Sequence, residues 1–137
     1  MIKPEDLTKE QFLEQILEIC DKNPDNVNPQ DTNEQCVYED PDGNHCLIGE
    51  WLSIHYSEIL EQIPKESNGC RFRMGEEEIW GTPARLILKR NNFPEEVYFV
   101  AAAIQGYANG GYWTEESNGA PRKWSTVKAK IENGEFS

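Results

Sequence analysis

The feature that most constrains this chain is a pattern of apolar residues at helical spacing, interrupted by clear breaking signals. Its first instance begins with Thr8 and Gln11, which together form a capping-box pattern. Apolar residues then recur every three or four positions from Phe12 to Cys20, and Asn23-Pro24 ends the run. This segment is predicted to be an amphipathic helix.

Four later segments carry the same helical signal. Asn44 is predicted to cap a second helix that begins near His45 and ends at Pro64. Thr82-Pro83 is typical of a helix start, and Gly110-Gly111 of a helix end. The predicted helices after the first therefore cover residues 45–63, 84–90, 95–109 and 121–134.

Outside the predicted helices, the sequence predicts a small amount of β-structure. Cys36 to Tyr38 reads as a short strand, and residues 70–74 alternate weakly and are predicted to pair with residues 77–80 as a hairpin. The 137 residues match one ordinary domain. The predicted fold is mainly α (α+β), with about five helices and a small β-hairpin or short strands, in a single compact domain spanning residues 1–137.

Charge divides the chain into two halves. Residues 1–66 hold 16 Asp and Glu against 4 Lys and Arg, whereas residues 67–137 hold 9 of each, so the net charge of −12 belongs to the first half. Such a field repels long nucleic acid and anionic membranes, and it steers the chain toward a partner with a basic surface. The alternative is that the acidic surface only keeps the protein in solution. The predicted partner-binding residues are Asp31, Glu34, Glu39, Asp40 and Asp42.

The first residues and the cysteine content indicate a compartment. No run approaches the roughly 20 apolar residues that cross a bilayer, and MIKPEDLTKE lacks the pattern of a signal peptide. We therefore expect a cytoplasmic protein, in the host cytoplasm if a phage encodes it. In that compartment the four cysteines are expected to be thiols.

Cysteine and histidine gather in one segment. Cys36, His45, Cys46 and His55 are separated by nine, one and nine positions, which lacks the close ligand pair of a structural zinc site. Cys46 near a helix start is a possible nucleophile only if His55 reaches it as a base. No known catalytic motif is present, so we expect no enzyme, no metal and no cofactor, while the Cys46/His55 chemistry stays open.

Arginines and aromatic residues concentrate in the second half. Guanidinium groups and aromatic rings together suit a phosphorylated, base-containing ligand, by bidentate contacts and stacking. The alternatives are a protein interface or simply core aromatics with solvated charges. The residues of this alternative ligand-binding site are Arg71, Arg73, Arg85, Tyr112, Trp113, Arg122 and Trp124.

One resemblance gives this pattern a context. The Cys36-x-Tyr38 motif, the C-L-I-G-x-x-L motif of Cys46 to Leu52, and Gln105 ahead of Gly110-Gly111 resemble small proteins of actinobacteria and their phages, for which no activity is assigned. The insertion around Arg71 to Trp80 departs from their pattern. The resemblance implies only a setting in which small accessory proteins bind and disable a host factor.

Three functions follow from these observations. The first is a phage-type accessory protein that inhibits a host anti-phage defence factor by non-catalytic binding, with its acidic surface docked on a basic or nucleic-acid-binding partner. The second is a sponge that sequesters a nucleotide-type immune signal in the arginine and aromatic set. The third is a Cys/His enzyme or zinc protein. The oligomeric state stays open.

Overall fold

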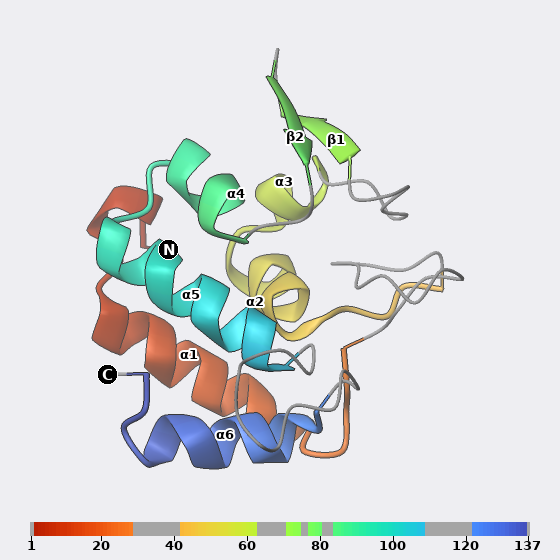
Figure 1. The fold of residues 1–137 in the computed structure, drawn as a ribbon, viewed down its shortest axis with the longest axis vertical. Helices are drawn as coiled ribbons and strands as arrows, with labels where there is room; N and C mark the ends of the chain where they lie inside the picture. The colour runs from red at the N-terminus through yellow and green to blue at the C-terminus, as the bar shows by residue number, and fades with distance from the viewer. Residues whose placement is uncertain are drawn as a thin grey trace.

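Helices make up most of the regular structure (Figure 1). The computed structural model describes residues 2–28, 42–62, 84–108 and 122–136 in full, and the backbone of residues 71–74 and 77–80. A 3₁₀ turn (Pro4–Asp6) comes first. The helices are α1 (Lys9–Lys22), α2 (Leu47–His55), α3 (Ser57–Leu60), α4 (Ala84–Arg90), α5 (Glu95–Ala108) and α6 (Trp124–Glu132).

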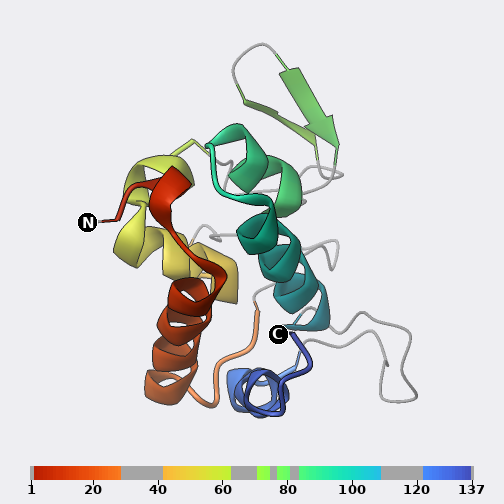
Figure 2. The ribbon, with the colours of Figure 1, turned by 90° about the vertical axis from the view of Figure 1, so that its left-hand side faces the viewer.

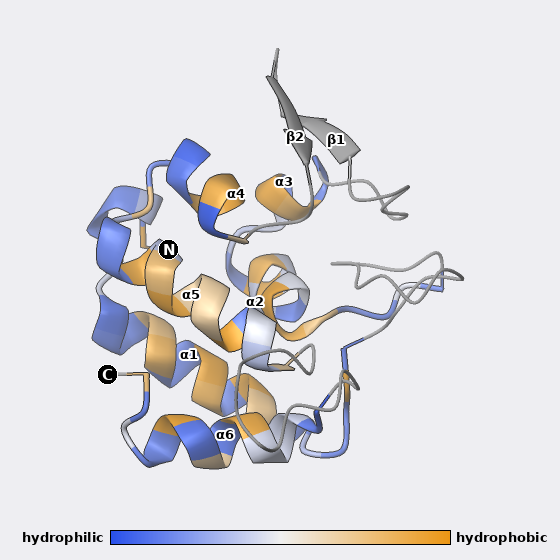
Figure 3. Ribbon diagram, in the orientation of Figure 1, coloured by the Kyte–Doolittle hydropathy of each residue, from blue (hydrophilic) through white to orange (hydrophobic). Residues whose placement is uncertain are grey.

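The structure confirms the predicted first helix. The Thr8 side chain accepts a hydrogen bond from the backbone N–H of Gln11, and the Gln11 side chain accepts one from the backbone N–H of Thr8. Polar and apolar residues alternate along α1 (Figure 3), and the buried ones are Phe12, Ile16, Ile19 and Cys20. The helix thus buries one side and exposes the other.

The second predicted helix is two helices. The prediction of one helix from His45 to Ile63 is wrong because the backbone leaves helical geometry at Tyr56, between α2 and α3 (φ −146°, ψ 55°). The Tyr56 hydroxyl donates to the Ile2 carbonyl at 2.8 Å, which ties this break to the N-terminal segment. The predicted cap, Asn44, is also wrong. Cys46 caps α2, its Sγ accepting from the Gly49 N–H at 3.2 Å.

The helices surround α5, which packs against α1, α2, α4 and α6. Figures 1 and 2 show α6 beneath α1 at one end of the molecule and α4 at the other. The buried side chains of these helices form one hydrophobic core. One of its two tryptophans, Trp51, meets Phe12 edge-on, with ring centroids 4.8 Å apart.

The mainly α class is confirmed. α4 has its predicted bounds, α5 covers Glu95–Ala108 of its predicted range while residue 109 lies outside the described residues, and α6 is shorter than predicted at both ends. β1 (Arg71–Met74) and β2 (Glu77–Trp80) pair antiparallel, with Arg71 opposite Trp80. The strand predicted at residues 36–38 lies outside the described residues. Within the described part of the chain, no helix is long and apolar enough to span a membrane.

Candidate functional site

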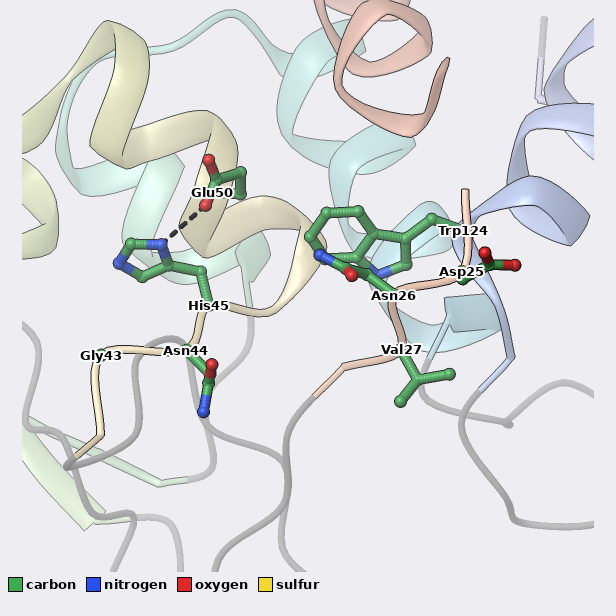
Figure 4. A pocket seen from close by; sticks show the side chains of 8 residues that line it. All are labelled: Asp25, Asn26, Val27, Gly43, Asn44, His45, Glu50 and Trp124. Carbon is green, nitrogen blue, oxygen red and sulfur yellow. Dashed lines mark hydrogen bonds and ion pairs between the residues drawn. The ribbon is translucent and has the colours of Figure 1, made fainter. Parts of the chain in front are cut away.

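A pocket of about 480 Å³ opens beside the start of α2 (Figure 4). One wall is the segment that follows α1, and the other is the segment that leads into α2. Gly43 has a φ of +86°, a conformation that suits glycine, and it turns the chain into this second wall. The described residues that line the pocket are Asp25, Asn26, Val27, Gly43, Asn44, His45, Glu50 and Trp124.

A histidine and a carboxylate are paired in the pocket wall. His45 Nδ1 lies 2.7 Å from Glu50 Oε2, and both side chains are partly buried. An ionised carboxylate only accepts hydrogen bonds, so Nδ1 is the donor of the hydrogen bond to Glu50. This bond fixes the ring orientation (Figure 4), as carboxylates do for histidines in many functional sites.

Asn28 joins the two walls behind the pocket. Its Oδ1 accepts from the Leu47 backbone N–H at 2.8 Å and from the Trp124 indole N–H at 3.0 Å. The Trp124 backbone N–H donates to the Asn26 carbonyl at 2.8 Å. One buried amide therefore positions the start of α2, the start of α6 and the segment after α1.

Cys46 is buried, and its sulfur accepts hydrogen bonds from two N–H groups. Besides the Gly49 N–H, its Sγ accepts from Gln105 Nε2 of α5 at 3.2 Å. Cys46 precedes the first residue of α2 and His55 is its last, so a rise of 1.5 Å per residue separates them by about 13 Å. The proposed Cys46/His55 nucleophile and base are therefore not paired.

His55 has a different environment from His45. Partial burial lowers the pKa of His55, and the nearby negative charge of Glu18 opposes this shift. Among the described residues, no group of three or more His, Cys, Asp or Glu side chains is placed to hold a metal ion. Cys36 and Cys70 lie outside those residues.

The predicted ligand-binding set does not converge where it is described. Arg85 is exposed on α4, and Arg122 precedes α6 at the opposite end of the molecule (Figure 1). The Arg122 guanidinium lies over the Tyr107 ring, 4.1 Å from its centroid, and Nη1 donates to the Tyr107 carbonyl at 2.6 Å. Trp124 is a core residue with 1% of its surface exposed.

The other members of that set cannot be placed in a site. Tyr112 and Trp113 lie outside the described residues, and only the backbone of Arg71 and Arg73 is described.

Of the predicted partner-binding residues, the structure describes Asp42, which is exposed next to Gly43. The rest lie outside the described residues: Asp31, Glu34, Glu39 and Asp40.

Sequence reasoning missed an acidic row on α1. Exposed carboxylates occupy successive turns on its outer side, at Glu10, Glu14, Glu18 and Asp21. Their spacing of four, four and three residues places them within about 80° of one another around the helix. That spacing is visible in the sequence. The lining of the pocket is not, because Asp25, Glu50 and Trp124 come from three separate segments.

The comparisons with known proteins add no assignment. No protein-family model matches the chain, and no curated protein or solved structure matches it.

Proposed function

We propose that this protein acts by non-catalytic binding, its acidic half docking on a basic surface of a partner protein. The observation that carries the proposal is the acidic row of α1, formed by Glu10, Glu14, Glu18 and Asp21. All four side chains are exposed on one side of the helix. A row of like charges costs stability in an isolated helix, so a partner that neutralises it gains from the contact.

The row is only partly neutralised within the protein. Lys22 Nζ lies 3.0 Å from Glu18 Oε1, and Lys128 Nζ lies 2.8 Å from Asp21 Oδ1. Hydrogen bonding and the positive charge of Lys128 lower the pKa of Asp21. Within the described part of the chain, Glu10 and Glu14 have no ion pair, so the N-terminal half of the row offers unneutralised charge to a partner.

The acidic field extends beyond α1. The described residues 42–62 contain Asp42, Glu50, Glu58 and Glu61 and no lysine or arginine. In the proposal, Asp31, Glu34, Glu39, Asp40 and Asp42 add their charges to the same docking surface. That the partner is a host anti-phage defence factor, and this chain a phage-type accessory protein, has the sequence resemblance as its only support.

The nucleotide-sponge alternative gains less from the described residues. Its Arg122 is engaged by Tyr107, its Trp124 is buried in the core, and its Arg85 lies at the far end of the molecule from both. We therefore propose docking on a partner protein, and not nucleotide binding, as the function.

A salt titration tests the proposal. The probe is a peptide rich in lysine and arginine, and its affinity for the whole protein is measured by calorimetry at rising NaCl concentration. We expect affinity to fall as salt rises. The triple variant Glu10→Gln/Glu14→Gln/Glu18→Gln is expected to bind about threefold more weakly or worse, since each exposed pair contributes about 0.2–1 kcal/mol.

The matched control changes exposed carboxylates of the second half. Glu95→Gln/Glu132→Gln/Glu135→Gln removes the same number of negative charges from α5, α6 and the turn after α6, and we expect it to bind the peptide nearly as the unaltered protein does. If the unaltered protein does not bind the peptide at low salt, or if the α1 variant and the control weaken binding equally, docking through the acidic half is wrong.

A further inference from the structure

We infer that the pocket beside α2 receives a cationic side chain, a lysine or arginine of the basic partner. This inference rests on the proposed function and names the point at which the partner is anchored. The two carboxylates in the lining, Asp25 and Glu50, lie on opposite walls (Figure 4). The described lining residues include no lysine or arginine.

Glu50 is prepared to accept a cation. Its Oε2 accepts from His45 at 2.7 Å, which holds the carboxylate in position. Its other oxygen, Oε1, has no hydrogen-bond partner within the described part of the chain. A carboxylate has acceptor sites on both oxygens, so Oε1 remains able to accept from an ammonium or guanidinium group.

Asp25 supplies the second charge at the rim. Lys123 Nζ lies 3.9 Å from Asp25 Oδ1, and both side chains are largely exposed. An exposed pair of this kind contributes little, so an incoming cation displaces Lys123 at small cost. Val27, with 46% of its surface exposed, adds apolar surface against which the methylene groups of a lysine or arginine can pack.

The same pocket is unsuited to an anion. The start of a helix attracts phosphate through its unpaired N–H groups, but two such groups of α2 are already engaged. Leu47 N–H donates to Asn28, and Gly49 N–H donates to Cys46. The carboxylates would also repel a phosphate. The charge of the lining therefore selects a cation over a nucleotide.

The pocket continues the acidic row of α1, which favours a protein side chain over a free amine. α1 runs from Lys9 to Lys22, and the chain then reaches the rim of the pocket at Asp25. A basic segment that lies along α1 can thus place one side chain in the pocket. Electrostatic attraction along the row would align the segment, and the pocket would fix its register.

The test compares two variants with equal changes in charge. Asp25→Asn/Glu50→Gln neutralises the pocket, and Glu95→Gln/Glu132→Gln neutralises two exposed carboxylates of α5 and α6, outside the acidic half. We expect the pocket variant to bind the lysine- and arginine-rich peptide about tenfold more weakly, because it removes both carboxylates of the described pocket lining. The control in α5 and α6 is expected to change affinity less than twofold.

A third variant keeps both pocket carboxylates, so its result does not depend on how their replacement affects folding. Val27→Arg places a guanidinium at the mouth of the pocket without altering the core, since Val27 is exposed, and we expect it to compete with the peptide and weaken its binding about tenfold. Thermal unfolding of all three variants checks that they are folded.

The outcomes separate the two proposals. If the pocket variants bind as tightly as the unaltered protein while the α1 triple variant binds weakly, the pocket inference is wrong and docking through the acidic half stands. If the unaltered protein does not bind the peptide, both are wrong. If N-acetyl-arginine amide binds as tightly as the peptide, the pocket holds a free cation and not a docked segment, which also overturns the inference.

Discussion

The two ends of α2 are held by different kinds of contact. Toward its C-terminal half, Trp51 meets Phe12, Tyr56 and Phe93, with ring centroids 4.8, 5.3 and 5.6 Å apart. At its start, Asn28 and Cys46 accept the N–H groups of the first turn. The aromatic end depends on buried apolar area, whereas the polar end depends on a few hydrogen bonds.

The candidate site lies at the polar end. Interlocked aromatic rings fill the interior closely at the other end, where a second pocket, of about 330 Å³, is lined by residues that include Tyr56. The polar end must satisfy buried donors with particular acceptors, and those acceptors come from segments that also form an open surface. The candidate site therefore borders the part of the core in which polar atoms, and not shape alone, specify the structure.

The largest effect is expected at the aromatic end. Trp51→Ala removes three aromatic contacts and leaves a cavity, and we expect it to lower the free energy of unfolding by about 3–5 kcal/mol. Urea denaturation measures this change. Trp51→Phe is the control because it keeps much of the ring packing, although it loses the 2.8 Å bond from the indole N–H to Gln15. Equal losses in the two variants would contradict the role of ring area.

The next effect is expected at the polar end. Asn28→Ala leaves the Leu47 N–H and the Trp124 indole N–H buried without their acceptor, at a cost of about 1–3 kcal/mol for each group. We expect a total loss of at least about 2 kcal/mol in urea denaturation.

A double-mutant cycle tests the assignment of that loss. Trp124→Phe removes the indole donor, so Asn28→Ala should cost less in its presence, with a coupling of about 0.5–3 kcal/mol. If the two losses simply add, the bond between Asn28 and Trp124 does not contribute to stability.

The buried thiols of Cys46 and Cys20 also differ in their surroundings. Cys46 accepts two N–H donors, whereas burial in α1 raises the pKa of Cys20 to about 12, with the positive charge of Lys128 opposing the shift. A thiol whose pKa is higher in the folded state stays protonated while the unfolded chain ionises. Its contribution to stability is therefore complete below the ordinary pKa near 9 and is lost as pH rises from there toward 12.

The alkaline loss can be measured directly. Between pH 9 and 11, Cys20 is expected to reduce the free energy of unfolding by up to about 1.4 kcal/mol per pH unit. Cys20→Ala should lack this slope. Burial also raises the pKa of Tyr56, which acts in both proteins, so the difference between the two pH profiles isolates Cys20. Parallel profiles would show that the thiol ionises equally in both states.

Local signals predicted the helices well where the cap and the apolar spacing lie within one segment. Thr8 and Gln11 marked the start of α1, and its buried residues follow from their spacing. The break at Tyr56 has no such local signal, and the Tyr56 hydroxyl there donates to the Ile2 carbonyl, 54 positions away. The cap of α2 was assigned to Asn44 by residue type, but Cys46 occupies that position.

The candidate site depends even more on distant contacts. Asn28 and Trp124 are 96 positions apart, and their hydrogen bond brings α6 to the pocket wall. Its histidine and cysteine residues made the segment around His45 a candidate site in the sequence. The side chain that pairs with His45 in the pocket is Glu50, which belongs to no recognisable sequence motif. Charge asymmetry indicated which half of the chain to examine but not which carboxylates face one another.

The smallest effect is expected at Gln105, the other buried polar residue besides Asn28 among those described. Its Nε2 donates to Cys46 Sγ at 3.2 Å, but its Oε1 is buried without a hydrogen-bond partner within the described part of the chain. Gln105→Met keeps the side-chain length and removes both the bond to sulfur and the unsatisfied oxygen, so these two changes offset each other. We expect the free energy of unfolding to change by less than about 1 kcal/mol, far less than for Asn28→Ala. A loss above about 2 kcal/mol would mean that a buried water satisfies Oε1 and that both buried amides stabilise the polar end.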